Sequence, residues 1–123
     1  MKKSQISLIT IIFLTMIACS SSSKNKVSTT EKPKSGIYAP GNEELLAIQK
    51  EYSDVTIATL NEGYTIYTQG ACINCHHPKN INNFEKAQWK DILDDMAEKA
   101  SISAIEKDAV NKYVLAIKAV QSK

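Results

Sequence analysis

Hydrophobic residues recur at helical spacing in the second half of the chain. One stripe repeats at i, i+3, i+4, i+7 and i+11, and it consists of Trp89, Ile92, Leu93, Met96 and Ala100. This spacing places the side chains on one face of an α-helix. A second stripe follows and is formed by Val110, Tyr113, Val114 and Ile117. No stretch alternates apolar and polar residues as a β-strand would, so the pattern predicts an all-α fold of three or four helices.

Local signals place the boundaries of the first two predicted helices. Pro40 and Gly41 form a turn, and Asn42 is expected to cap a helix over residues 43–52. The second helix is predicted over residues 55–67, and Gly70 is expected to end it.

Two capping boxes precede the last two predicted helices. Asn82 with Glu85 three residues later is expected to open a helix that ends near Ala100. Ser103 and Glu106 repeat the motif before the final helix. We therefore expect these helices to be joined by short loops.

The N-terminus has the pattern of an export signal. Lys2 and Lys3 precede a run of 13 uncharged, mostly apolar residues that ends at Ala18. A membrane-spanning helix needs roughly 20 apolar residues, so this run is too short. Residues 16–19, Met-Ile-Ala-Cys, resemble the lipobox of bacterial lipoproteins, in which the cysteine carries the lipid. We expect residues 1–18 to be a lipoprotein signal peptide and Cys19 to be lipidated; ordinary cleavage nearby is the alternative.

A polar segment follows the predicted lipidation site. Residues 20–36 are rich in Ser, Thr and Lys and contain one large aliphatic residue, Val27. Such a composition buries too little apolar surface to fold. The chain is thus expected to comprise a lipidated flexible tether over 19–36 and a single domain over 37–123. It would be exported and anchored to a bacterial membrane, facing the periplasm.

Charge argues against a nucleic-acid partner. All 15 basic residues are lysines, and removal of residues 1–18 would leave 13 lysines against 13 acidic residues. The lysines form no basic stripe, and no nucleotide-binding loop is present. We expect neither nucleic acid nor nucleotide as a partner.

The chemistry is concentrated in residues 72–76, whose sequence Cys-Ile-Asn-Cys-His is the C-x-x-C-H attachment signature of c-type haem. Thiols at this spacing can bond the two vinyl groups along one porphyrin edge. The histidine that follows the second cysteine is then brought to the iron as an axial ligand. The motif predicts one covalent haem c held by Cys72, Cys75 and His76.

Three other uses of a C-x-x-C-H motif fit this sequence less well. A structural zinc site needs four protein ligands, and beyond the motif the mature chain offers His77 and Cys19. A thioredoxin-type C-x-x-C accompanies a βαβ pattern, which is lacking in this sequence. A plain disulfide would leave His76 without a role.

Met96 is the predicted sixth ligand. It is the one methionine that remains after Met1 and Met16 leave with the signal peptide, and methionine is a common axial ligand of c-type haem. His77 is a poor candidate because His76 is committed to the opposite face of the ring. The alternative is that Met96 only fills the core. Trp89, Leu93 and Ile81 are expected to pack against the haem.

From about Leu60 to Ala119, roughly half of the chain, the sequence resembles small class I monohaem cytochromes c. The resemblance rests on Gly63 and Tyr67 ahead of the C-x-x-C-H motif and on Ser103 to Glu106 leading into a helix that carries Tyr113. It rests also on the spacing of Trp89, Ile92, Leu93 and Met96. It implies a helical bundle around one haem, with a haem core over about 55–123. It also implies that the helix before the motif crosses the last helix, with Gly63 meeting Tyr113. Family members fix the ligand histidine through a backbone carbonyl, and Pro78 would supply it here.

The expected function is electron transfer and not enzymatic catalysis. With His76 and Met96 bound, the protein would carry single electrons between redox partners of a respiratory chain. Lys79 and Lys86 could steer an acidic partner. Two alternatives remain: a gas-binding, sensing or catalytic haem with an open or labile sixth site, and a haem subunit of a larger oxidoreductase.

Overall fold

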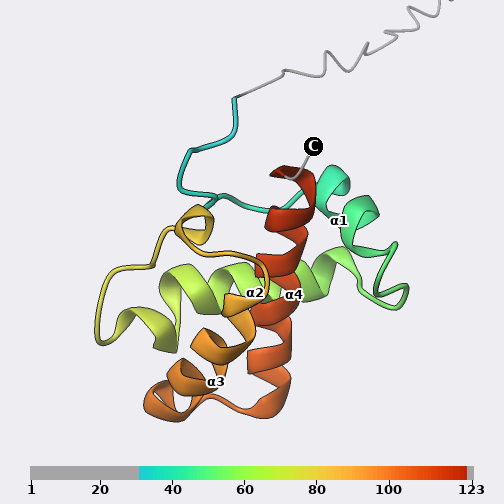
Figure 1. Ribbon diagram of the computed structural model, residues 1–123. Helices are drawn as coiled ribbons and strands as arrows, with labels where there is room; N and C mark the ends of the chain where they lie inside the picture. The colour runs from blue at the N-terminus through green and yellow to red at the C-terminus, as the bar shows by residue number, and fades with distance from the viewer. Residues whose placement is uncertain (1–30, 122–123) are drawn as a thin grey trace, which may run out of the picture.

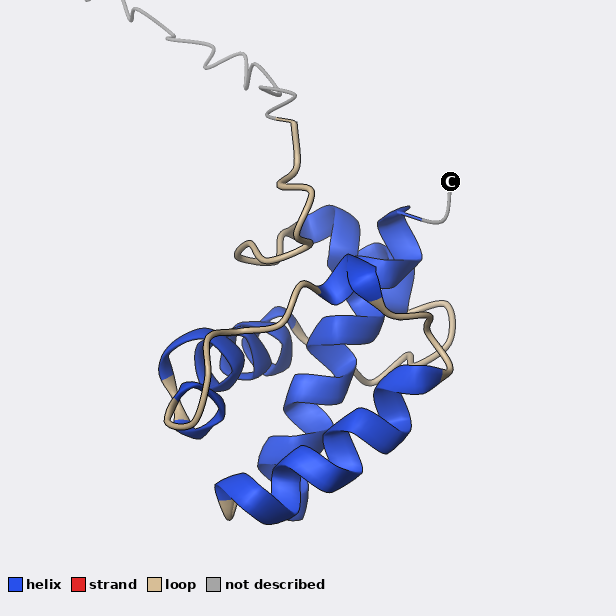
Figure 2. Ribbon diagram, turned by 60° about the vertical axis from the view of Figure 1, so that its left-hand side comes forward, coloured by secondary structure: helices blue, strands red, loops and turns tan. Residues whose placement is uncertain are grey.

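The computed structural model describes residues 31–121 as a set of helices. Their order is α1 (Asn42–Ile48), α2 (Ile57–Gln69), η1 (Ala71–Ile73), η2 (Ile81–Asn83), α3 (Gln88–Ala100) and α4 (Ala104–Gln121), where η denotes a short 3₁₀ helix. Within residues 31–121 there is no β-strand (Figure 2). The predicted all-α fold is confirmed.

The crossing of α2 and α4 forms the centre of the fold (Figure 1). Gly63 lies at the point of closest approach, because a Cβ atom added to it would be 2.1 Å from the carbonyl oxygen of Ala109 and 2.9 Å from Cβ of Tyr113. Any side chain at position 63 would force the two helices apart. The expected meeting of Gly63 and Tyr113 is confirmed.

Capping residues explain where α2 and α4 begin. Thr56 caps α2, and its hydroxyl accepts a hydrogen bond from the Thr59 amide at 3.2 Å. Helix α2 thus begins two residues later than predicted; it ends as expected, at Gly70. The capping box before α4 is confirmed, since the Glu106 amide donates to Ser103 Oγ and the Ser103 amide donates to the Glu106 carboxylate.

Two other capping predictions were wrong. Gly41, not Asn42, is the N-cap of α1, because Gly41 holds the extended backbone and Asn42 is already helical; α1 ends at Ile48, short of Tyr52. Helix α3 begins at Gln88, and Asn82 lies in the separate turn η2. The Asn82 side chain donates to the backbone oxygen of Lys34, so a contact distant in sequence replaces the expected cap.

Two clusters of buried side chains flank the crossing. The larger lies between α2, α3 and α4 and consists of Tyr67, Ile81, Trp89, Leu93, Val110, Tyr113, Val114 and Ile117. The smaller lies where α1 and the start of α2 meet α4, and it consists of Ile48, Val55, Leu60, Leu115 and Ala116. The apolar stripes of α3 and α4 therefore meet in the larger cluster, as their spacing indicates.

The last residues of the predicted tether contact the domain. Lys32 forms an ion pair with Glu43, and Gly36 is buried. Domain contacts therefore begin before the expected boundary at Ile37. The predicted signal peptide, Cys19 and the rest of the tether lie outside the described residues. Within 31–121, no helix is long and apolar enough to cross a bilayer.

Candidate functional site

An apolar cavity of about 270 Å³ lies between the end of α2, the segment that follows it, and one face of α3. Its lining residues are Tyr67, Ala71, Cys72, Cys75, His76, Lys79, Trp89, Ile92, Leu93, Met96, Lys99 and Ala100. Six of them are the predicted haem-binding residues, Cys72, Cys75, His76, Trp89, Leu93 and Met96. The fold thus brings all six to one cavity, although they lie on two separate segments of the chain.

The C-x-x-C-H motif occupies a tight turn at the end of α2. Gly70 ends the helix, and η1 continues at once with hydrogen bonds from the Ile73 amide to the Gly70 oxygen and from the Asn74 amide to the Ala71 oxygen, both at 3.3 Å. Gly70 is needed here because a Cβ atom would lie 2.8 Å from Cα of Ile66. The turn places both cysteines on the wall of the cavity.

The two thiols differ in their surroundings. Cys72 is half-buried and Cys75 is exposed, and neither is in a disulfide. Burial raises the pKa of the Cys72 thiol above its usual range. Both sulfur atoms therefore border the cavity as thiols that can react with a bound group.

The His76 ring is oriented by a backbone carbonyl. Its Nδ1 atom lies 2.7 Å from the backbone oxygen of His77. Because a carbonyl only accepts, Nδ1 carries the proton in the neutral ring and Nε2 keeps a lone pair for a metal. The carbonyl belongs to His77 and not to Pro78, so the expectation for Pro78 was wrong in detail.

Helix α3 forms the opposite wall of the cavity. Met96 is half-buried there, and Leu93 and Trp89 are buried one and two turns before it. The Trp89 indole N–H donates to the backbone oxygen of Ile81 at 3.2 Å, which satisfies its one polar group. Ile81 itself is fully buried in the larger core cluster and does not line the cavity, so the lining does not support its expected contact with the haem.

Tyr67, which belongs to the resemblance but for which the sequence indicates no contact, supports the floor of the cavity. Its hydroxyl donates to the backbone oxygen of Lys79, and its ring lies edge-on to that of Trp89 with centroids 6.2 Å apart. Burial raises the pKa of Tyr67 well above its usual range, so the hydroxyl stays protonated. The sequence places Tyr67 one helical turn after Gly63, on the same face of α2, but this spacing does not identify the carbonyl that its hydroxyl contacts.

Lys79, Lys86 and Lys99 differ in their partners and in their place relative to the cavity. Lys99 lines the cavity and pairs with Asp95 at 2.7 Å, whereas Lys86 pairs with Glu51 at 2.6 Å. Lys79 lines the cavity, is exposed and has no ion-pair partner within residues 31–121. Of the two lysines expected to steer a partner, only Lys79 lies at the cavity.

The donor set and the lining together fit a haem. Two thiols, an imidazole with a defined lone pair and a thioether surround an otherwise mostly apolar space, and these are the groups that bond a porphyrin edge and its iron. In the described part of the chain, no three His, Cys, Asp or Glu side chains are grouped to hold a metal ion. A structural zinc site would need four ligands.

Comparison of the chain with known protein families, with curated proteins and with solved structures gave no match.

Proposed function

We propose that this protein is a monohaem c-type cytochrome that carries single electrons. One observation carries the proposal: the C-x-x-C-H residues, at the end of α2, line the same apolar cavity as Met96, on α3. The motif and the predicted sixth ligand thus border one space, as binding to a single iron would require.

Each of four residues would make one bond to the haem. The thiols of Cys72 and Cys75 would each add across one vinyl group, forming a C–S bond while the thiol hydrogen goes to the neighbouring carbon. His76 would bind the iron through Nε2, since Nδ1 is held by the His77 carbonyl. Met96 would bind through its sulfur from α3. When bound, the haem supplies an iron that alternates between the ferrous and ferric states.

The remaining cavity residues keep the site apolar. Trp89 and Leu93 are buried, with 1% and 5% of their surface exposed, and Ile92 lines the cavity beside them. They would exclude water from the iron, and methionine in place of a second histidine raises the reduction potential. A site with both axial positions filled by the chain favours a carrier over an enzyme.

The partner surface would be the open side of the cavity. Lys79 and Lys99 lie there, and Lys79 has no ion-pair partner among the described residues. Lys79 would steer weak docking of an acidic redox partner. Export, lipidation at Cys19 and a place in a respiratory chain remain part of the proposal on the strength of residues 1–19.

The test is the optical spectrum of protein made in cells that attach haem to exported chains. We expect a low-spin spectrum, the weak long-wavelength ferric band of sulfur ligation, and no change when carbon monoxide is added to the ferrous form. Met96→Leu keeps the apolar volume and removes the sulfur, so it should lose that band and bind carbon monoxide. Ile92→Leu, which alters the same wall without removing a sulfur, should keep the wild-type spectrum.

A wild-type protein that is high-spin and binds carbon monoxide readily would contradict the carrier proposal. That result would favour a gas-binding or catalytic haem and would return Met96 to a packing role.

A further inference from the structure

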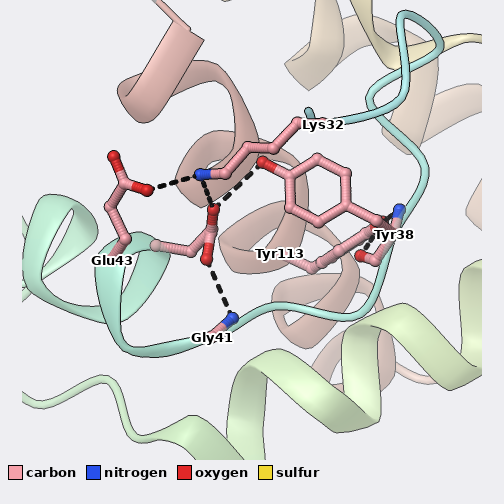
Figure 3. Close-up of polar contacts among 6 residues, drawn as sticks. Lys32, Tyr38, Gly41, Glu43 and Tyr113 are labelled. Carbon is pink, nitrogen blue, oxygen red and sulfur yellow. Dashed lines mark hydrogen bonds and ion pairs between the residues drawn. The ribbon is translucent and has the colours of Figure 1, made fainter. Parts of the chain in front are cut away.

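Residues 33–38, which we call the strap, run across the top of the domain before α1 (Figure 1). Just before the strap, Lys32 pairs with the carboxylates of Glu43, at 2.7 Å, and Glu44. At its end, the Tyr38 backbone amide and oxygen both hydrogen-bond to the Tyr113 hydroxyl, at 3.3 and 3.1 Å (Figure 3). The chain is thus held to α1 just before the strap and to α4 at the end of the strap.

The middle of the strap is bonded to the segment that follows the C-x-x-C-H motif. The Ser35 oxygen accepts hydrogen bonds from the Ile81 amide at 2.8 Å and from the Asn82 amide at 3.4 Å. The Lys34 oxygen accepts one from the Asn82 side chain at 2.8 Å. The bond to the Ser35 oxygen satisfies the backbone amide of Ile81, a residue that is fully buried from solvent.

Gly36 makes this approach feasible. Its φ of 72° lies in the left-handed region, and its amide closes a turn onto the Pro33 oxygen. A Cβ atom there would lie 3.0 Å from Asn82 Oδ1, 3.1 Å from Ile81 Cβ and 3.2 Å from Ile117 Cγ2. A side chain at this position would therefore push the strap away from η2.

The other side of the same segment is bonded to the cavity wall. Tyr67 donates to the Lys79 oxygen and Trp89 donates to the Ile81 oxygen. Residues 77–80, between the motif and η2, have no regular secondary structure. Their path is therefore set by bonds to cavity residues on one side and by the strap on the other.

We propose that the strap is a positioning element of the site: it fixes residues 79–82 and, through the short connection to His76, the approach of that histidine to the cavity. The positioning of His76 rests on the proposed function. The fixing of residues 79–82 concerns the chain alone. A segment some forty residues before His76 in the sequence is thereby part of the site's framework.

The test compares two glycines of the N-terminal segment in the holoprotein. Gly36→Ala introduces the contacts described above, whereas a Cβ at Gly41 meets only Glu44 Oε2 at 3.5 Å, an ordinary distance. We expect hydrogen exchange at the Ile81 and Asn82 amides to rise about tenfold or more in Gly36→Ala and to stay within about twofold in Gly41→Ala. The ferric band of sulfur ligation should weaken in Gly36→Ala alone.

A second variant, Asn82→Ala, distinguishes a local effect on residues 79–83 from unfolding of the whole domain. Asn82→Ala removes the bond to the Lys34 oxygen and should raise exchange over residues 79–83 without raising it in α4. Equal exchange in the two glycine variants would overturn the proposal, as would a uniform rise across the domain in both Gly36→Ala and Asn82→Ala.

Two outcomes separate this proposal from the function on which it rests. Faster local exchange with an unchanged ferric spectrum would mean that the strap holds the segment but does not position His76, which overturns the positioning role. A wild-type chain that purifies without haem would contradict the proposed function, and exchange at Ile81 in that chain would still decide whether the strap fixes the segment.

Discussion

The α2–α4 crossing and the cavity bury apolar side chains in opposite ways. At the crossing, the backbones touch at Gly63 and Ala109, and the surrounding side chains, such as Tyr113 and Val114, are fully buried. Around the cavity, Cys72 and Met96 are only half-buried and Cys75 is exposed.

The difference shows where the chain fills its own apolar interior and where it leaves apolar space open. At the crossing, the faces of α2 and α4 that meet are filled by the chain itself, because Gly63 contacts Ala109 and Tyr113 and the side chain of Leu60 is fully buried. The cavity side leaves an apolar space of about 270 Å³ bordered by reactive and metal-binding side chains. We propose that a haem fills this space.

The most severe way to break the crossing is Gly63→Ala. Alanine in place of glycine normally favours a helix, by about 0.5–1 kcal/mol. Here the new Cβ would lie 2.1 Å from the Ala109 oxygen, so we expect a loss of about 3 kcal/mol in the free energy of unfolding, measured with guanidinium chloride. Gly41→Ala, which meets no such obstacle, is the control. A loss below about 1 kcal/mol would show that the helices do not meet this closely.

A smaller loss is expected where α1 and the strap meet α4. The Glu44 carboxylate is 3% exposed and accepts hydrogen bonds from Lys32, the Tyr38 hydroxyl and the Gly41 amide. Burial opposes its ionisation, but these donors outweigh burial and hold the pKa of Glu44 below its ordinary value of 4.5. We expect Glu44→Gln to cost about 2 kcal/mol at neutral pH.

The pH dependence follows from the direction of that shift. Since the pKa of Glu44 is lower in the folded than in the unfolded state, its contribution is complete above 4.5 and is lost as pH falls through the lowered value. The gap in stability between wild type and Glu44→Gln should therefore close in acid. Glu43→Gln is the control: Glu43 also pairs with Lys32 but is 57% exposed, so its loss should cost under about 1 kcal/mol. Equal costs for the two variants would contradict the buried network.

The smallest expected effect lies on the cavity side. Tyr67→Phe removes the hydroxyl that donates to the Lys79 oxygen and should cost about 1 kcal/mol in unfolding free energy. Tyr64 lies on the same helix, and its hydroxyl bonds to none of residues 31–121, so Tyr64→Phe should stay within about 0.5 kcal/mol of wild type. If both variants matched the wild type, the hydroxyl of Tyr67 would not support the cavity.

The sequence predicted those parts of the fold that depend on local signals. The apolar stripes of α3 and α4, the capping box at Ser103 and the stop at Gly70 all follow from residues close together in the chain. The six predicted cavity residues were found because a motif of fixed spacing and one remaining methionine named most of them.

The sequence misled where distant segments compete with local ones. Asn82 and Glu85 have the spacing of a capping box. The Asn82 side chain instead hydrogen-bonds to the Lys34 oxygen in the strap, and residues 81–83 form η2. Residues 31–36 have the composition of a tether, yet Ser35 and Gly36 pack against η2 through backbone groups that composition does not reveal. Backbone carbonyls also carry the contacts of Tyr67 and His76, and for that reason neither contact was predicted in full.

The proposal that Cys72 and Cys75 hold a haem covalently predicts the intact mass of the denatured protein. The wild type, produced with haem-attachment machinery, should exceed its polypeptide mass by one haem. The double variant Cys72→Ala/Cys75→Ala should carry none after denaturation. A folded, exported wild type whose mass is that of the polypeptide alone would contradict the account.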